Sequence, residues 1–138
     1  MRKTFIAISL VAVVAVVAGP ALAGGKPRGG GGKTTPSGSF TWRLLNSPDG
    51  TPNYGEAVTF DVDSNAYHPS VRLTCYQGGV WVTNQTVGFY DGWPWSQEFP
   101  LRSWKWTGGA ADCVAKLYYL NRRGGEVTLD ELSFQVWD

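Results

Sequence analysis

Histidine and cysteine, which carry much of enzyme chemistry, are scarce in this chain, with one histidine and two cysteines in 138 residues. Without a second histidine or a cysteine pair at ligand spacing, the sequence predicts no metal site. A catalytic triad could be built only on His68, in the turn Tyr67-His68-Pro69, and no Gly-x-Ser-x-Gly motif is present. We therefore predict no catalytic residue, no cofactor and no enzymatic activity, with His68 a solvated surface residue.

The acidic residues leave two other chemistries open. Asp61-Val62-Asp63-Ser64-Asn65 resembles the start of a calcium loop, but Ala66 stands where glycine is needed and Arg72 where a bidentate glutamate belongs. This excludes an EF-hand and leaves a strand-end calcium site as an alternative to two outward strand residues. A glycoside hydrolase needs two carboxylates about 5–10 Å apart, and none of the eleven acidic residues is singled out by its neighbours.

Long apolar runs are confined to the N-terminus. A positive start, Met1 to Thr4, precedes an almost wholly apolar stretch over residues 5–18, and Gly19-Pro20 and Ala21-Leu22-Ala23 follow. This order predicts a cleavable secretory signal peptide over residues 1–23. The alternative is an uncleaved signal anchor, which the Gly-Pro break and the alanine box disfavour. We expect a secreted, extracellular protein without stable membrane insertion.

The charge is unevenly distributed along the chain. Residues 24–38 are rich in glycine, basic and without large apolar side chains, which predicts a flexible linker. From residue 39 onward there are seven basic and eleven acidic residues, a net charge of −4. A nucleic-acid-binding domain typically carries a basic patch instead, so we predict no nucleic-acid partner.

Both cysteines, Cys75 and Cys113, follow the predicted signal peptide. In an oxidising compartment an even number of cysteines indicates a disulfide. Closing the loop between them would stabilise the domain by about 4 kcal/mol in the chain-entropy model. The alternative is two free thiols, or one reactive thiol.

Short runs rich in valine, threonine and aromatic residues alternate with turn residues from Ser39 to the C-terminus, and no helical periodicity is sustained. Gln77-Gly78-Gly79 is typical of a hairpin turn, and Pro100 indicates an edge strand because it has no amide hydrogen. The sequence predicts one all-β domain over residues 39–138, a single antiparallel two-sheet β-sandwich. About seven strands are expected, near residues 40–45, 57–63, 70–77, 80–87, 95–101, 112–120 and 127–137.

Two segments resemble strands of the immunoglobulin-like (Ig/Fn3-type) superfamily. Gly55-Glu56-Ala57-Val58-Thr59-Phe60 is similar to a second strand, and Ala110-Ala111-Asp112-Cys113-Val114-Ala115 to a sixth. The resemblance covers residues 39–138 and implies an Ig-like sandwich. The chain departs from antibody-type domains: the cysteine spacing is short, no tyrosine stands two residues before Cys113, and Cys75 falls on the third strand. A disulfide would then join neighbouring strands of one sheet.

Aromatic residues are abundant, with seven tryptophans in the chain. Several lie in turn-rich connections, where an aromatic ring can stack on a sugar ring or anchor a protein interface. Strand parity places others on the outer face of one sheet, and Trp81 is a further candidate there. The alternative is structural: loop tryptophans can fold back over the open ends of the sandwich, and cross-strand aromatic residues can stabilise a sheet without binding anything. The candidate ligand-binding residues are the loop residues Tyr90, Trp93, Trp95, Trp104 and Trp106 and the face residues Tyr76, Tyr118 and Trp137.

The sequence thus favours a secreted binding or adhesion module that recognises an extracellular polysaccharide or a protein through surface aromatic residues. Two alternatives stay open. One is a small secreted hydrolase that uses paired carboxylates. The other is a structural subunit of a surface assembly, with the glycine-rich linker as its tether.

Overall fold

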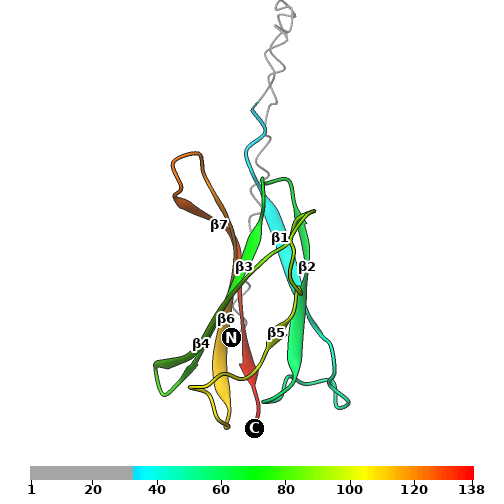
Figure 1. Cartoon of the computed structure of the whole chain (residues 1–138), viewed down its shortest axis with the longest axis vertical. Coiled ribbons are helices and arrows are strands. Elements are labelled where there is room, and N and C mark those ends of the chain that lie inside the picture. Colours follow the sequence, from blue (N-terminus) through cyan, green and yellow to red (C-terminus); the bar gives the residue numbers. More distant parts are fainter. Residues whose placement is uncertain (1–32) are drawn as a thin grey trace, which may run out of the picture. The chain divides into compact units, whose positions relative to one another are not determined.

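The computed structural model describes residues 33–138, and the predicted signal peptide and most of the predicted linker lie outside the described residues. The described chain forms seven β-strands (Figure 1). They are β1 (Gly38–Leu44), β2 (Ala57–Ser64), β3 (Ser70–Gln77), β4 (Val80–Gly88), β5 (Phe99–Pro100), β6 (Ala111–Leu120) and β7 (Glu126–Val136).

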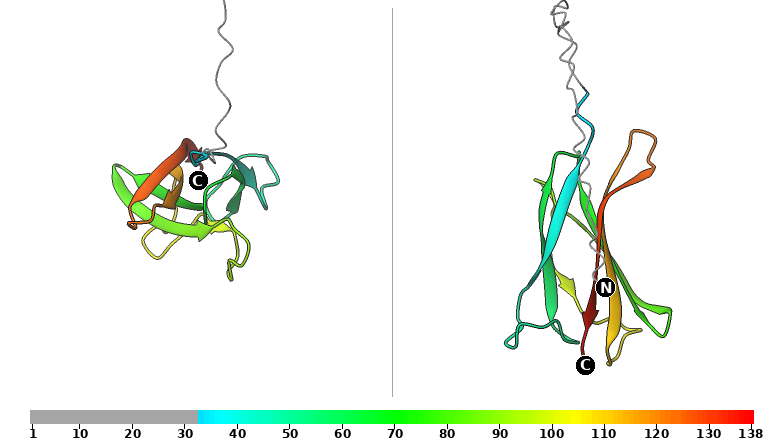
Figure 2. Two further views of the ribbon diagram at one scale, coloured as in Figure 1. Left: turned by 90° about the horizontal axis from the view of Figure 1, so that it is seen from above. Right: turned by 180° about the vertical axis from the view of Figure 1, so that it is seen from behind.

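The strands form two antiparallel sheets, with the order β1-β2-β5 in one and β4-β3-β6-β7 in the other. The sheets lie as two layers, which are separate when the domain is seen from behind (Figure 2). The prediction of an all-β, two-sheet sandwich of seven strands is confirmed. Strands β3 and β4 are joined by the predicted glycine hairpin, in which Gly78 and Gly79 have φ of 56° and 80°.

The core lies between the layers and is built by alternate residues of each strand. In β6, Cys113, Ala115 and Leu117 are buried, while the residues between them face outward. The other sheet contributes Phe40, Val58 and Phe60, among others. Where β1 and β7 lie side by side at one open edge, the ring of Trp42 stacks on that of Phe134, with centroids 5.3 Å apart.

A disulfide joins Cys75 of β3 to Cys113 of β6. These residues are directly opposite each other in the antiparallel register, with a Cα–Cα distance of 4.0 Å. The predicted bond between neighbouring strands of one sheet is therefore confirmed, and it does not join the two layers.

The fifth strand is much shorter than predicted. Only Phe99 and Pro100 pair with β2, at the edge of their sheet, whereas the sequence predicted a strand over residues 95–101. Pro100 cannot donate a backbone hydrogen bond, but Leu101 after it still donates to the carbonyl of Glu56 at 2.8 Å, so the strand is short on its N-terminal side. Before Phe99 in the chain, a side-chain contact takes the place of backbone pairing, since the Thr59 hydroxyl donates to the carbonyl of Gln97.

No helix among the described residues is long and apolar enough to cross a membrane.

Candidate binding surface

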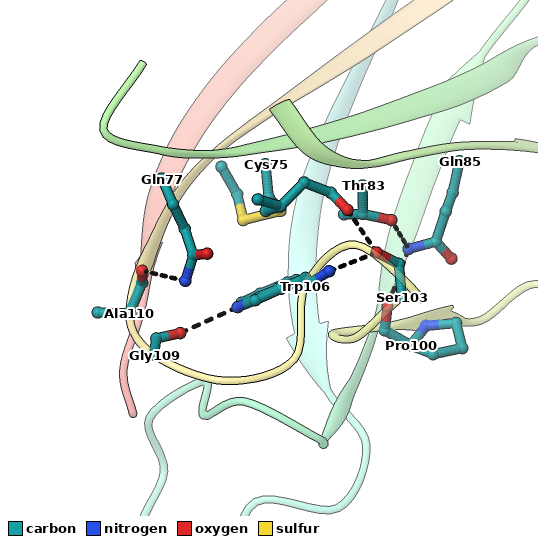
Figure 3. The surroundings of a disulfide bond; sticks show 11 residues. Cys75, Gln77, Thr83, Gln85, Pro100, Ser103, Trp106, Gly109 and Ala110 are labelled. Atoms are coloured by element: carbon teal, nitrogen blue, oxygen red, sulfur yellow. Dashed lines mark hydrogen bonds between the residues drawn. A yellow bond between two sulfur atoms is a disulfide. The ribbon is translucent and has the colours of Figure 1, made fainter. Parts of the chain in front are cut away.

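Trp106 lies in the core, with none of its surface exposed. Its indole N–H donates to the carbonyl of Gly109 at 3.0 Å, and its backbone N–H donates to the Ser103 hydroxyl at 2.9 Å (Figure 3). The prediction that Trp106 belongs to an exposed loop platform is therefore wrong. Its loop folds back so that this one ring closes the sandwich beside the disulfide.

The connection between β5 and β6 is held against the edge of β4 by side-chain hydrogen bonds. The Ser103 hydroxyl donates to the carbonyl of Val82 and accepts the N–H of Lys105 at 3.1 Å. Gln77 of β3 donates to the carbonyl of Gly108 at 2.8 Å. It also donates to the carbonyl of Ala110 at 3.1 Å (Figure 3). This polar fixation at both ends gives the exposed residues of the connection a defined position.

A groove of about 430 Å³ runs between this connection and β4. Trp81 and Trp104 both line it, with 47% and 85% of their surfaces exposed. Polar side chains from both walls complete the lining. The full lining of this Trp81–Trp104 groove is Trp81, Val82, Thr83, Asn84, Gln85, Arg102, Ser103 and Trp104.

Two cations lie at the groove. Arg102 is exposed and belongs to the lining, and the Lys105 ammonium lies 4.0 Å from the centroid of the Trp81 ring. Trp81 pairs across the hairpin with the partly exposed Tyr76, so the two rings share the outer side of the sheet. No acidic residue is part of the lining. The groove therefore combines aromatic rings, amides and positive charge.

The sequence pointed to Tyr76, Trp81 and Trp104 but missed Asn84, Arg102 and Lys105. Arg102 and Lys105 flank Trp104 in the chain, in the order Arg102-Ser103-Trp104-Lys105. This interleaving of charge and aromatic residues was the available signal. Asn84 comes from another strand, and no local pattern links it to them.

A second aromatic group lies at the other end of β3 and β4. His68 stacks between Tyr67 and Tyr90, with ring centroids 3.8 and 4.0 Å apart. The chain of rings continues through Trp93 to Trp95, which is 69% exposed. We call these five residues the His68 cluster. His68 is exposed, as predicted, but its two faces are covered by tyrosine rings.

Trp93 has a structural part in this cluster. It is only partly exposed and packs against the core. A Cβ added at Gly88 would lie 2.4 Å from its ring, so the ring rests directly on the backbone at the end of β4. Tyr90 is also partly buried, which leaves Trp95 and Tyr67 as the accessible rings.

The predicted outer-face patch of Tyr76, Tyr118 and Trp137 does not form one surface. Tyr118 is opposite Ser70, whereas Tyr76 is opposite Asp112, so six residues, roughly 20 Å of strand, separate the two tyrosines. Trp137 is exposed, beyond the end of β7. The prediction assumed a regular strand register and an outer face that no other side chain covers.

Tyr118 is also only 6% exposed, because the Arg72 guanidinium lies over its ring at 4.7 Å. Arg72 forms a bidentate ion pair with Glu126, one contact of which is 3.0 Å. This pairing lowers the pKa of Glu126 and raises that of Arg72, in both cases chiefly through the hydrogen bonds between them. An ion pair thus covers the ring that the sequence placed at the surface.

Residues 33–138 offer few candidates for metal binding or for catalysis by carboxylates. That part of the chain holds no group of three histidine, cysteine or acidic side chains placed to bind a metal ion. A hollow of about 500 Å³ beside β2 is lined by Asp61, Asp63 and Asp91, among others. Asp61 is ion-paired with Arg43, with 3.4 Å between Nε and Oδ1.

Compared with models of protein families, with curated proteins and with solved structures, the chain matches none. The resemblance to the immunoglobulin-like superfamily therefore stays a prediction.

Proposed function

We propose that this protein is an exported binding module that holds an extracellular polysaccharide in the Trp81–Trp104 groove. The observation that carries the proposal is that two exposed tryptophans line one groove together with amide and guanidinium groups. A sugar ring has an apolar face and a rim of hydroxyls. Aromatic rings can stack on the apolar face, and the side chains of Asn84 and Arg102 can form hydrogen bonds with the hydroxyls.

Export is supported by two independent features. Residues 1–23 have the order of a secretory signal peptide. The domain also contains the Cys75–Cys113 disulfide, and such bonds persist in oxidising compartments. Polysaccharides of cell surfaces and matrices are found in the same compartments.

The fixation of the β5–β6 connection also favours binding. Trp104 exposes most of its surface, yet the residues on either side of it are hydrogen-bonded to β4 and to the loop itself. A ligand then meets a ring that is already ordered, and association costs less conformational entropy.

The test is retention on an array of extracellular polysaccharides. We expect Trp81→Ala with Trp104→Ala to abolish retention and to leave the thermal unfolding midpoint nearly unchanged. Trp95→Ala, which removes a ring of intermediate exposure (69%, against 47% for Trp81 and 85% for Trp104) from the His68 cluster, is the matched variant and should bind normally. If Trp95→Ala loses retention and the double variant does not, the groove is the wrong site. If the domain binds none of the polysaccharides and binds a protein instead, the glycan proposal is overturned.

One observation favours a second candidate, a carboxylate-dependent hydrolase. The hollow beside β2 brings Asp61, Asp63 and Asp91 to one place. In that case the wild type would release reducing sugar from the retained polysaccharide, and Asp63→Asn would not. The third possibility, a structural subunit, predicts a particle mass that rises with concentration in size-exclusion chromatography with light scattering.

A further inference from the structure

We infer, on the basis of the proposed function, that the polysaccharide is acidic and bears a carboxylate or sulfate group that Arg102 binds. The inference starts from the ion pairs of the described residues. There are two, Arg43 with Asp61 and Arg72 with Glu126. Within residues 33–138, neither Arg102 nor Lys105 therefore has a carboxylate within 4.0 Å.

Neither Asp112 nor Asp138 belongs to the groove lining. Asp112 lies opposite Tyr76, one strand farther from Trp81, and Asp138 accepts the backbone N–H of Gly109 at 3.2 Å. The groove lining itself contains Arg102 and no acidic residue. At physiological salt, charges more than about 8 Å away are largely screened. The lining itself is therefore positively charged, although residues 39–138 carry a net charge of −4.

The two tryptophans have different roles in this arrangement. One face of the Trp81 ring is occupied by the Lys105 ammonium, 4.0 Å from the centroid. Trp104 has no such cover and is 85% exposed, so it is the platform on which a sugar ring stacks. Trp81 instead holds Lys105 in place by a cation–π contact and so forms a charged wall.

Arg102 suits the charged substituent of the sugar. Its guanidinium is planar and binds a carboxylate or sulfate through two parallel hydrogen bonds. Since Arg102 and Trp104 both line the groove, a sugar ring stacked on Trp104 can place its substituent beside this group. Asn84, on the opposite wall, is available to the ring hydroxyls.

The experiment compares each acidic polysaccharide with its neutral counterpart on one array: polygalacturonate with its carboxyl-reduced form, and dextran sulfate with dextran. We expect retention on at least one acidic polymer and a loss of about tenfold or more in affinity for its neutral partner, the size of one lost charge-assisted contact. Arg102→Gln should cause a similar loss on the acidic polymer and leave thermal unfolding unchanged.

Arg122→Gln is the matched control, because it removes one exposed charge from the connection between β6 and β7, at the far end of the sandwich. If it weakens binding as much as Arg102→Gln, the attraction is unspecific and the inference fails. Equal retention of acidic and neutral polymers would overturn the acidic ligand but keep the proposed function. Retention of none of the four polymers would count against both, and binding to the sulfated but not the carboxylated polymer would identify sulfate as the recognised group.

Discussion

The Ser103 hydroxyl donates a hydrogen bond to the carbonyl of Val82, and this contact closes the groove between the edge strand β4 and the β5–β6 connection. The same oxygen accepts the backbone N–H groups of Lys105 and Trp106, at 3.1 and 2.9 Å. One hydroxyl therefore fixes the position of the exposed Trp104 and of the buried Trp106 on either side of Lys105.

Replacing Ser103 with alanine should loosen this region. Two backbone N–H groups and one carbonyl lose their partner in a partly buried place, and we expect a loss of about 1–3 kcal/mol in the free energy of unfolding. Urea titration followed by tryptophan fluorescence measures it. Ser96→Ala, at an exposed serine of the connection between β4 and β5, should unfold at the wild-type urea concentration. If Ser103→Ala does so too, the hydroxyl does not fix the loop.

Trp104 and Trp106 should respond in opposite ways to the same substitution. Trp106→Ala removes a fully buried ring and should cost about 3–5 kcal/mol of stability. Trp104→Ala should change stability by no more than about 0.5 kcal/mol, because the ring is largely exposed. Thermal unfolding of the two variants under identical conditions measures the difference. A large destabilisation by Trp104→Ala would mean that its ring packs on the domain.

Trp104 is exposed and Trp106 is buried, and this difference could not be predicted from the sequence. Residues two apart point to the same side only in a strand. Residues 101–110 form a connection whose course is set by side chains of other elements, such as Gln77. The direction of each ring therefore depends on contacts that no local pattern contains.

The strands could be predicted well because their signals are local. Alternation of apolar residues and the glycines at positions 78 and 79 define β3 and β4 without reference to the rest of the chain. Six strands lie within two residues of their predicted bounds at each end. Tyr118 shows the opposite case, since its parity is right but the ion pair of Arg72 and Glu126 covers its ring. Whether this ring is covered depends on residues of β3, β6 and β7, which no local pattern links.

Removing the disulfide should destabilise the domain without changing its topology. Cys75 and Cys113 are 38 residues apart, and opening the loop between them costs about 4 kcal/mol in the chain-entropy model. We expect Cys75→Ala with Cys113→Ala to lower the urea midpoint and to reduce the free energy of unfolding by that amount, while the far-ultraviolet circular dichroism spectrum keeps its β-sheet shape. Wild-type protein reduced with dithiothreitol controls for the loss of the two sulfur atoms. An unchanged midpoint in both samples would show that the bond contributes nothing to stability.

Acidification should weaken the contact between Arg72 and Glu126. The hydrogen bonds from Arg72 lower the pKa of Glu126 in the folded state below its value in the unfolded chain. A group with a lowered folded pKa contributes stability above its unfolded pKa, near 4.3, and this contribution disappears as the pH falls through the folded value. The midpoint temperature of thermal unfolding should therefore fall less steeply between pH 6 and pH 2.5 for Glu126→Gln than for the wild type.

The matched control for this pH dependence is Glu98→Gln, which removes an exposed carboxylate from outside both ion pairs of the described residues. Its melting curve should follow that of the wild type across the same pH range. Added salt should reduce the difference between the wild type and Glu126→Gln, since the pair is partly exposed and is screened. If Glu126→Gln and Glu98→Gln behave alike at every pH, the ion pair over Tyr118 does not stabilise the fold, and the cover of that ring comes from packing of the Arg72 side chain alone.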